Sequence, residues 1–468
     1  MITLKVKHNW LKESGQRLDA SYYLSDGPLT NIKLEKSPYP LTSLSKETIE
    51  IFKGNIFKRV YVHNPDTGYP FMTASDMMKS DLNSGKFVSK KYTDIANLMV
   101  DENWILTSRS GTLGNTVYTN KGFKNFLVTD DLIRIIPNNN KVNGGFLYAY
   151  LTSKYGNGLL TQSSYGGVVK HIEPHHIKNL PIPVFPIKEQ LAIDNLIKQA
   201  SRLREEANGL IQKSNELFNS ENNLNYDNDL LDISENTIQL GYKIKSSNLS
   251  AISLKARNYS FRANKIIEYW ATKKGVVLNN FLKEPFTMGA RASFKRITSL
   301  NFKGKDLISQ GDIHKQNPKK FKQVRAKREI TINDTAQRGS LIMPSAGTLG
   351  ENEIFTRPLL VRNNFEDKLL SEVIGKFQCK SEIDAAYLFT ALSSTAGFRI
   401  LRAKVYGTNL MYPNWEFIKN LSVPIASSEI KSKIGQMVLD AFDKRGLADK
   451  KENEAIDLVE KEIEQWQK

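Results

Sequence analysis

The sequence contains two copies of one large module, and this internal repeat limits the possible folds more than any other feature. Residues 111–114 (GTLG) recur unchanged at 347–350, and residues 146–156 (FLYAYLTSKYG) match 387–397 (YLFTALSSTAG). The further matches keep the same order: 57–60 with 294–297, 68–77 with 304–313, 165–166 with 406–407, and 177–180 with 418–421. A short-period solenoid needs at least three small units. Two collinear copies therefore predict a tandem duplication of a large module.

Each copy begins with a stretch that predicts a mixed α+β fold. Short β-like runs are broken by turn signals such as residues 64–68 (NPDTG). Residues 104–106 and 340–343 indicate strands that enter the repeated Gly-Thr-Leu-Gly turn, and helical stretches follow near 146–155 and 385–392. We therefore expect an α+β domain in each half of the chain.

Each copy then ends in a long helix. In the first copy, proline-rich residues 180–186 lead into a helix expected over 187–218, about 48 Å long at ~1.5 Å per residue. Apolar residues follow it in alternating steps of three and four, as in a coiled-coil seam: Ile193, Leu196, Ala200, Leu203, Ala207 and Leu210. The second helix keeps this spacing at Ile434, Val438, Ala441, Ala448, Ala455 and Val459.

Two interpretations of these helices are open. Each could lie as an amphipathic helix on its own domain, and the charged Arg445 and Glu452 at seam positions of the second helix weaken its apolar stripe. The seam nevertheless continues in both copies at matched positions, which favours an antiparallel coiled-coil spacer formed by the two helices. The expected limits are a first globular domain over 1–185, its helix over 186–220, a polar linker over 221–250, a second globular domain over 251–426 and its helix over 427–468.

The charge of the chain points to a polyanionic partner. Sixty-six Lys and Arg residues against 49 Asp and Glu leave a formal net charge of +17. Such an excess favours nucleic acid, although a basic protein of another kind, such as a ribosome-like one, has the same signature. The single cysteine, Cys379, excludes a disulfide framework. With no signal-like N-terminus and no apolar run long enough to cross a bilayer, we expect a cytoplasmic protein without a membrane partner.

Several segments resemble one protein family. Residues 108–114 (SRSGTLG) resemble the turn that follows a strand in the target recognition domains of Type I restriction–modification specificity subunits. Residues 165–184, running into 186–190 (PIKEQ), resemble that family's passage from recognition domain to spacer helix, and residues 17–23 (RLDASYY) resemble the opening of its first domain. The resemblance covers nearly the whole chain, and the second copy departs from it more, for example at 427–429 (SSE).

The resemblance implies a function without catalysis in this chain. It implies two target recognition domains that read the halves of a bipartite, asymmetric site in double-stranded DNA. It further implies that the helices dock two methyltransferase subunits, which restriction subunits then join. S-adenosylmethionine, ATP and Mg²⁺ are expected in those partners, and no cofactor is expected in this chain. The alternatives are a DNA-reading subunit of a related phage-defence complex and a stand-alone DNA modification enzyme.

Basic residues, with two tyrosines beside them, are the candidates for DNA contact, because Arg reads base edges and Lys positions the phosphate backbone. The second copy holds two acid-free basic runs, which a solvated surface would also explain. The candidates in the first copy are Lys53, Lys58, Arg59, Arg109, Tyr165 and Lys170. Those in the second copy are Arg291, Lys295, Arg296, Lys319, Lys320, Lys322, Arg325, Lys327, Arg328, Arg402, Lys404 and Tyr406. The Gly-Thr-Leu-Gly turns either approach a phosphate closely or only require positive φ.

Motifs for catalysis are missing from the sequence. It contains no Gly-rich fingerprint for a methyl-donor cofactor, no Asp/Asn-Pro-Pro-aromatic stretch and no Walker-type phosphate loop. Residues 366–368 (EDK) have part of a nuclease pattern but lack a preceding Asp in a strand. His171, His175 and His176 do not predict a metal site, because Pro174 interrupts the helix that would align them and no complementary ligands stand nearby.

Overall fold

The computed structural model of the chain divides into two compact units. It describes residues 6, 8, 11, 23, 26–83, 85–162, 171–226, 228–231, 243–246, 249–289, 294–296, 304–319 and 321–466. The first unit comprises Met1–Glu205 with Leu447–Lys468, and the second comprises Glu206–Gly446. Each of the two long helices therefore contributes one part to the first unit and one part to the second.

The first unit contains two four-stranded sheets. Its central sheet is antiparallel, in the order β2 (Thr48–Lys53), β9 (Leu132–Pro137), β6 (Ile105–Ser108), β7 (Thr116–Tyr118). Its outer sheet has the order β3 (Tyr61–Val62), β5 (Phe87–Ser89), β4 (Gly68–Met72), β8 (Leu127–Val128), and β4 pairs with β8 in parallel. A small sheet joins β1 (Leu41–Ser43) to β10 (Pro181–Pro183).

Helices cover one face of the central sheet of the first unit. They are α3 (Asp26–Leu34), α4 (Gly144–Thr152), α5 (Lys154–Gln162), α6 (Pro174–Ile177) and the first part of α7 (Ile187–Glu221). Alternate residues of one strand face different cores: Ile105 packs in the cluster that contains α4, whereas Leu106 packs with Met72 and Val128 of the outer sheet. The central sheet is therefore buried on both faces, which explains its continuous apolar strands.

The second unit repeats the two four-stranded sheets of the first, strand for strand. Its central sheet has the order β12 (Thr287–Met288), β19 (Ile374–Phe377), β16 (Leu341–Pro344), β17 (Leu359–Leu360). Its outer sheet has the order β13 (Phe294–Arg296), β15 (Lys322–Ala326), β14 (Lys305–Ile308), β18 (Leu369–Leu370), and β14 again pairs with β18 in parallel. Two small sheets join β11 (Gly275–Val277) to β22 (Ser422–Pro424) and β20 (Val405–Gly407) to β21 (Met411–Pro413).

The helices of the second unit follow the same order. They are α8 (Asn228–Leu231), α9 (Phe261–Ala271), α10 (Glu382–Ser393), α11 (Thr395–Ala403), α12 (Trp415–Ile418) and the first part of α13 (Ser428–Gln465). Helix α10 lies against β17 and α9 against α11, as α4 lies against β7 and α3 against α5 in the first unit. The predicted α+β class is confirmed, and both units share one topology.

Two buried cations occupy equivalent places in the central sheets. Arg134 of β9 is opposite Leu106, and Lys376 of β19 is opposite Ile342. The Arg134 guanidinium donates to the carbonyls of Leu132, Thr129 and Val128 at 2.7–3.0 Å, and burial lowers its pKa to about 10. The Lys376 ammonium donates to two carbonyls and to Gln337, and burial likewise lowers its pKa. Each cation holds neighbouring loops against its sheet by donating hydrogen bonds to main-chain carbonyl oxygens.

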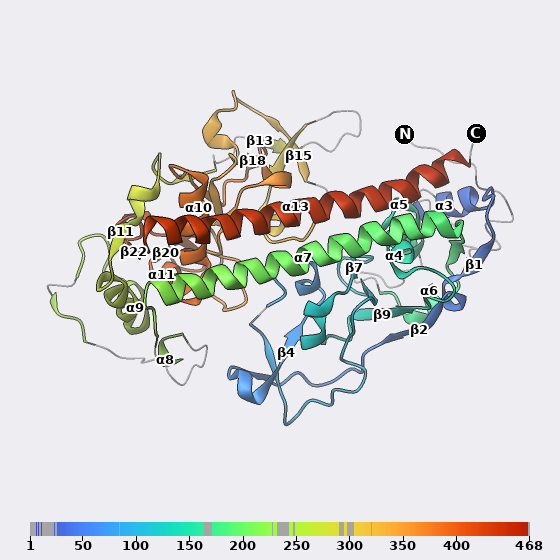
Figure 1. Cartoon of the computed structure of the whole chain (residues 1–468), viewed down its shortest axis with the longest axis horizontal. Helices are drawn as coiled ribbons and strands as arrows, with labels where there is room; N and C mark the ends of the chain where they lie inside the picture. The colour runs from blue at the N-terminus through green and yellow to red at the C-terminus, as the bar shows by residue number, and fades with distance from the viewer. Residues whose placement is uncertain are drawn as a thin grey trace. The chain divides into compact units, whose positions relative to one another are not determined.

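The long helices α7 and α13 are each one uninterrupted helix (Figure 1). In the first unit, Ile193 and Ile197 of α7 share a core with Ala455, Val459 and Ile463 of α13. In the second unit, Phe218 of α7 shares a core with residues of α13 that include Ile434 and Val438. The predicted seam residues that are fully or almost fully buried are Ile193, Ala200, Ala207, Ile434, Val438, Ala441, Ala448, Ala455 and Val459. Leu196, Leu203 and Leu210 are partly buried.

Glu452, which interrupts the apolar seam of α13, has a buried partner within the first unit. Its carboxylate lies 2.5 Å from the guanidinium of Arg204 on α7, which also contacts Asp449 at 3.0 Å. The Tyr148 hydroxyl of α4 donates to Glu452 at 2.9 Å. Burial disfavours the charged guanidinium, but Glu452 and Asp449 together raise the pKa of Arg204. The charge in the seam is therefore matched by an opposite charge on the facing helix.

Within the described residues, no helix is both long and apolar enough to span a membrane.

Candidate nucleic-acid interface

The outer sheet of the second unit carries two cations directly opposite each other. Lys295 of β13 and Arg325 of β15 are paired in the antiparallel register, so their side chains lie on the same face. Both are exposed, and neither has an ion-pair partner among the residues that the structure describes. Like charges at opposite positions destabilise a sheet. The pair is therefore suited to an anionic ligand that lies across the two strands.

More predicted cations lie on or beside β15. Lys319, Lys322 and Lys327 are exposed. Arg328 is exposed as well, but its guanidinium forms two bonds of 2.5–2.8 Å to Asp334. That pairing lowers the pKa of Asp334 to about 2. Exposed cations thus lie on or beside β15, and among them Arg328 is already neutralised by a neighbouring carboxylate.

The outer sheet of the first unit has different chemistry at the same place in the fold. Tyr61 of β3 is 52% exposed. The Lys90 ammonium lies 5.7 Å from the ring centre of Tyr69, and that of Lys91 lies 5.2 Å from the ring centre of the exposed Tyr92. The predicted contact residue Lys58 is also exposed. The outer sheet of the first unit therefore carries tyrosine–lysine pairs, whereas that of the second unit carries a pair of cations.

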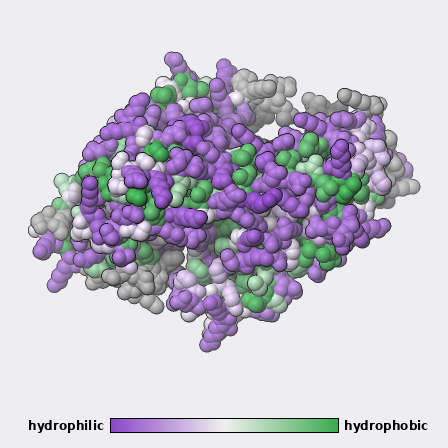
Figure 2. Space-filling model, viewed as in Figure 1, coloured by the Kyte–Doolittle hydropathy of each residue, from purple (hydrophilic) through white to green (hydrophobic). Residues whose placement is uncertain are grey.

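The exposed surface in the view of Figure 2 is mainly hydrophilic. Hydrophobic residues lie scattered between the polar and charged ones rather than in one continuous area. Scattered apolar residues are ordinary on protein surfaces. This face therefore offers mostly polar and charged contacts to a partner.

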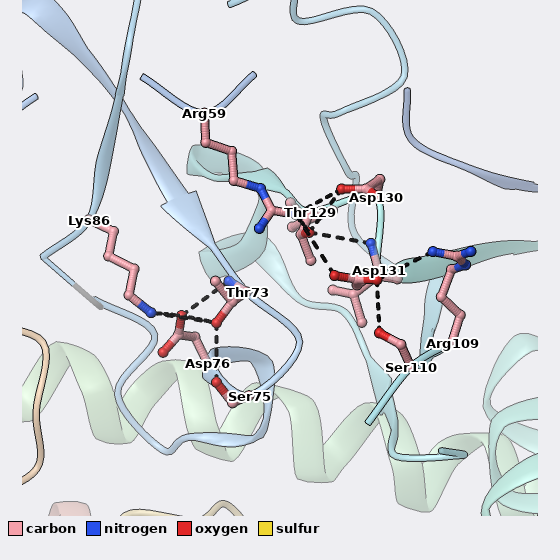
Figure 3. A network of polar contacts seen from close by, with 12 residues as sticks. Arg59, Thr73, Ser75, Asp76, Lys86, Arg109, Ser110, Thr129, Asp130 and Asp131 are labelled. Atoms are coloured by element: carbon pink, nitrogen blue, oxygen red, sulfur yellow. Dashed lines mark hydrogen bonds and ion pairs between the residues drawn. The ribbon is translucent and has the colours of Figure 1, made fainter. Parts of the chain in front are cut away.

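Arg59, a predicted DNA contact, belongs to a polar network beside the first Gly-Thr-Leu-Gly turn (Figure 3). Its guanidinium donates at 2.9 Å to both Asp130 and Thr129 and lies 3.8 Å from Asp131. The Ser110 hydroxyl donates to Asp131 at 2.8 Å. The side chain of Arg59 is therefore fixed by acids of its own unit.

The network continues through Arg109 and Lys53, which were also expected to contact DNA. Arg109 donates to Asp131 at 3.3 Å and to Glu173 at 2.5 Å, and Lys53 lies 3.0 Å from Glu173. Burial opposes ionisation of Glu173, but Arg109 and Lys53 lower its pKa. The positive charges of this cluster are balanced internally, so an approaching phosphate would have to compete with carboxylates.

The two Gly-Thr-Leu-Gly turns differ in backbone conformation. Gly111 (φ +69°) and Gly114 (φ +75°) are left-handed, which glycine adopts without strain. Neither Gly347 nor Gly350 has such a φ, and a Cβ at Gly347 would lie 2.9 Å from the Cβ of Phe355. The expectation of positive φ therefore describes the first turn only, while at Gly347 a close approach of Phe355 explains the glycine.

Arg402 and Lys404 were expected on the DNA surface, and the structure corrects this. They are only 6% and 8% exposed. Arg402 donates to the carbonyls of Glu353 and Phe355, and also to that of Gly350, so it holds the loop of the second turn. The Lys404 ammonium donates to Asn264 and to the Asn258 carbonyl, and burial lowers its pKa to about 8. Both cations act inside the fold, because Nη1 and Nη2 of Arg402 and Nζ of Lys404 donate to oxygens of the chain.

The remaining predicted DNA-contact residues are either exposed or lie outside the described residues. Tyr406 is half exposed, at 50%. Tyr165, Lys170, Arg291 and Lys320 lie outside the described residues, as does the side chain of Arg296.

The ring of His176 lies 4.0 Å from that of His175, and the Nδ1 atom of His176 accepts from the Glu173 amide. In the part of the chain that is described, no group of three His, Cys, Asp or Glu residues is placed to hold a metal.

One pair of polar clusters was missed from the sequence. Asp76 accepts from the Thr73 amide at 3.1 Å and from the Lys79 ammonium at 2.8 Å. Burial opposes its ionisation, but hydrogen bonds from Lys79 and Lys86 lower the pKa of Asp76 to about 2. The Thr73, Ser75, Asp76 and Lys86 side chains are drawn together in Figure 3.

The second unit repeats this cluster at the matched position. Asp312 accepts from the Ser309 amide at 3.0 Å and from the Lys315 ammonium at 3.0 Å. The signal was visible in the aligned stretches as Ser or Thr, then Asp three residues later and Lys three residues after that. In both units the carboxylate fixes the turn that leaves the outer sheet.

A family model matches part of the chain. Residues 45–217 match the model described as Type I restriction modification DNA specificity domain. The match runs from just before β2 of the first unit into helix α7. An independent comparison thus confirms, over residues 45–217, the resemblance inferred from the sequence.

Solved structures of such subunits align with the chain at low identity. The Type I restriction–modification S subunit from M. genitalium is 13% identical, with 92% of this chain and 96% of that chain covered and a TM-score of 0.37. The HsdS subunit from Thermoanaerobacter tengcongensis is 11% identical, with 92% and 96% covered and a TM-score of 0.27. Comparison with curated proteins gives no match.

Proposed function

Because residues 45–217 match the model described as Type I restriction modification DNA specificity domain, we propose that each unit of this chain reads one half of a bipartite DNA target. The observation that carries the proposal is the repetition of the whole strand order in the second unit, including the parallel pair of the outer sheet. A second domain of the same topology can present its side chains to DNA in the same way as the first.

The proposed target is asymmetric, because the two outer sheets differ. Lys295 and Arg325 form a cation pair in the second unit, whereas Tyr61 and the Lys90–Tyr69 pair occupy the outer sheet of the first. Different side chains in the same frame select different base sequences and different phosphate geometries. Two identical half-sites would be expected to require two identical surfaces.

The paired long helices are proposed to act as an antiparallel coiled-coil spacer between the half-sites. Contacts within each unit support this. Arg204 of α7 binds Asp449 of α13 in the first unit, and Arg445 of α13 donates to Asn208 of α7 at 3.0 Å in the second. At ~1.5 Å per residue, the 35 residues of α7 extend about 52 Å, close to ~15 base pairs of DNA.

The chain is proposed to target catalysis that its partners perform. Methyltransferase subunits would dock on the helices, and restriction subunits would join them, with S-adenosylmethionine, ATP and Mg²⁺ bound in those partners. Exposed apolar side chains on the helices fit such docking: Ile187 and Leu191 on α7, and Leu447 and Leu458 on α13. The chain itself is proposed to be non-catalytic.

Selection of duplexes from random DNA tests the proposal. The full-length chain is used alone and in co-purified complex with its methyltransferase partner, and bound duplexes are sequenced. The expected result is two short, different blocks separated by a gap of constant length. Selection of one continuous block, or of no sequence at all by either preparation, would contradict the proposed function.

A further inference from the structure

The hairpin formed by β20 and β21 in the second unit has a shape that only glycine permits. Tyr406 is paired with Tyr412, and Gly407 with Met411. Gly407 has a φ of +110°, and a Cβ there would lie 2.1 Å from the Leu410 carbonyl oxygen. Residues 408–410 therefore form a tight tip whose geometry depends on Gly407.

The base of this hairpin is held by buried hydrogen bonds. The side-chain amide of Asn258 donates to the carbonyls of Ala403 and Val405 at 2.8 and 2.9 Å. The buried Lys404 donates to Asn264 at 2.9 Å. Because these bonds join the hairpin base to the turn at Ala256–Tyr259 and to helix α9, its position is fixed before any ligand arrives.

The hairpin is also tied to the second Gly-Thr-Leu-Gly turn. The Gly347 amide donates to the Met411 carbonyl at 3.1 Å, and the Met411 amide donates to the Gly347 carbonyl at 2.9 Å. In the first unit, Ser110 forms the corresponding bridge to His171. The second Gly-Thr-Leu-Gly turn thus supports one side of the hairpin through main-chain hydrogen bonds, which is a structural role for this motif.

The tip projects polar groups that the fold does not use. Thr408 and Asn409 are exposed, and within the described residues neither side chain has a hydrogen-bond partner. The Tyr406 ring stacks on Tyr412 with ring centres 5.5 Å apart, which stiffens the strands behind the tip. A rigid backbone that carries two free, short polar side chains loses little entropy when it binds.

Cations flank the hairpin. The Lys255 ammonium donates to the Gly407 carbonyl at 2.6 Å and is otherwise exposed. Arg257, two residues further, is exposed and has no ion-pair partner in the described parts of the chain. Both stand in the segment whose Asn258 fixes the hairpin base. Phosphates on either side of a groove would meet these charges when the tip enters it.

We propose, on the basis of the proposed function, that this hairpin enters the major groove of the second half-site and that Asn409 reads an adenine there. A two-stranded ribbon fits the major groove, and an Asn amide matches the N6 and N7 edge of adenine with two hydrogen bonds. Thr408 contacts the neighbouring base, and Arg257 contacts the phosphate backbone. The assignment concerns the second unit, since residues 163–170 of the first lie outside the described residues.

The test measures the base preference of the Asn409→Ala variant at every target position, using the full-length chain in complex with its methyltransferase partner. The expected result is loss of an adenine preference at one position of one half-site, on the order of ten- to a hundred-fold. The other half-site and the gap stay unchanged. Asn280→Ala is the matched control, since Asn280 is an exposed asparagine outside the hairpin.

Two more variants separate base reading from backbone binding. Arg257→Ala is expected to weaken binding to all sequences alike and to reduce the salt slope by about one. Gly407→Ala is expected to lose the same half-site preference as Asn409→Ala, because it deforms the tip. An Asn409→Ala variant with the wild-type preference at every position overturns the assignment while the proposed function stands. A wild-type complex that selects no sequence overturns both.

Discussion

Arg134 shows how a residue that resembles a surface cation serves the core of its unit. It is fully buried, and its guanidinium donates to four main-chain carbonyls, among them those of Leu98 and Val128. No carboxylate forms an ion pair with it among the described residues. The charge is compensated by backbone dipoles that converge from two loops, so both loops depend on this one side chain.

Replacing Arg134 with Met should therefore destabilise the protein strongly. The change leaves several buried carbonyl oxygens without donors, and we expect a loss of about 2–4 kcal/mol in the free energy of unfolding. Denaturant titration measures this. Arg202→Met, at an exposed position of α7, is the control, with an expected change within ~0.5 kcal/mol. A loss below ~1 kcal/mol at Arg134 would show that the loops are held by other contacts.

Lys404 gives the stability of the chain a specific dependence on pH. Burial lowers its pKa from 10.5 to about 8, so between these values the unfolded chain binds more protons than the folded chain. The contribution of Lys404 to stability therefore rises as the pH increases from about 8 to 10.5, by roughly 3 kcal/mol in total. Below about pH 8, the full cost of a buried charge is present.

Comparison of wild type with Lys404→Met isolates this effect from other titrating groups. Unfolding free energies are measured at several values between pH 7 and 10. The wild type should gain stability relative to the variant as the pH rises. A difference that stays constant over this range would mean that Lys404 keeps an ordinary pKa in the folded state.

At the scale of elements, the contact of α7 with α13 in the first unit is set by an ion cluster as well as by apolar packing. Arg204 lies between Asp449 and Glu452, and Tyr148 donates to Glu452. Buried charges at a helix contact fix the register, because a shift by one turn leaves each of them unpaired. Glu452 therefore belongs to the pairing that it was expected to interrupt.

Removing one charge from this cluster should cost more than removing two. Arg204→Met leaves two buried carboxylates without their cation, with an expected loss of about 3–5 kcal/mol. Adding Glu452→Leu should recover part of that loss, since one uncompensated charge is gone. A double-mutant cycle by denaturant unfolding measures the coupling. Strictly additive losses would contradict a direct interaction between Arg204 and Glu452.

The length of α7 is expected to set the gap between the half-sites. Four residues inserted in the middle of the helix add ~6 Å, which corresponds to about two base pairs. The unread gap of the target should widen by that amount while both half-sites keep their sequence. Sequencing of selected duplexes measures both quantities. A changed half-site with an unchanged gap would contradict the spacer.

At the scale of the whole molecule, sequence repeats predicted two units with one α+β topology. Matched stretches such as residues 111–114 and 347–350 fall in equivalent turns after β6 and β16. Most of the heptad positions are buried, and the strand before each turn was expected. These features depend on local periodicity and on comparison of the chain with itself, which a single sequence contains.

The roles of individual cations could not be predicted in the same way. Lys404 and Lys295 look alike in sequence, yet Lys404 is buried by Asn258 and Asn264 while Lys295 is exposed. Lys53 and Arg109 meet Glu173, which lies far along the chain. Burial and pairing of a charge are decided by residues that only the tertiary fold brings near. Charge density therefore predicts a nucleic-acid interface but does not rank its residues.

A map of modified bases in the source genome, with and without this gene, tests the central claim most directly. The account predicts that methylation disappears at one split motif whose two halves differ and are separated by a constant gap. It predicts that methylation returns when the gene is restored. An identical map in both strains, although the methyltransferase partner is expressed and active, would contradict the assignment of target selection to this chain.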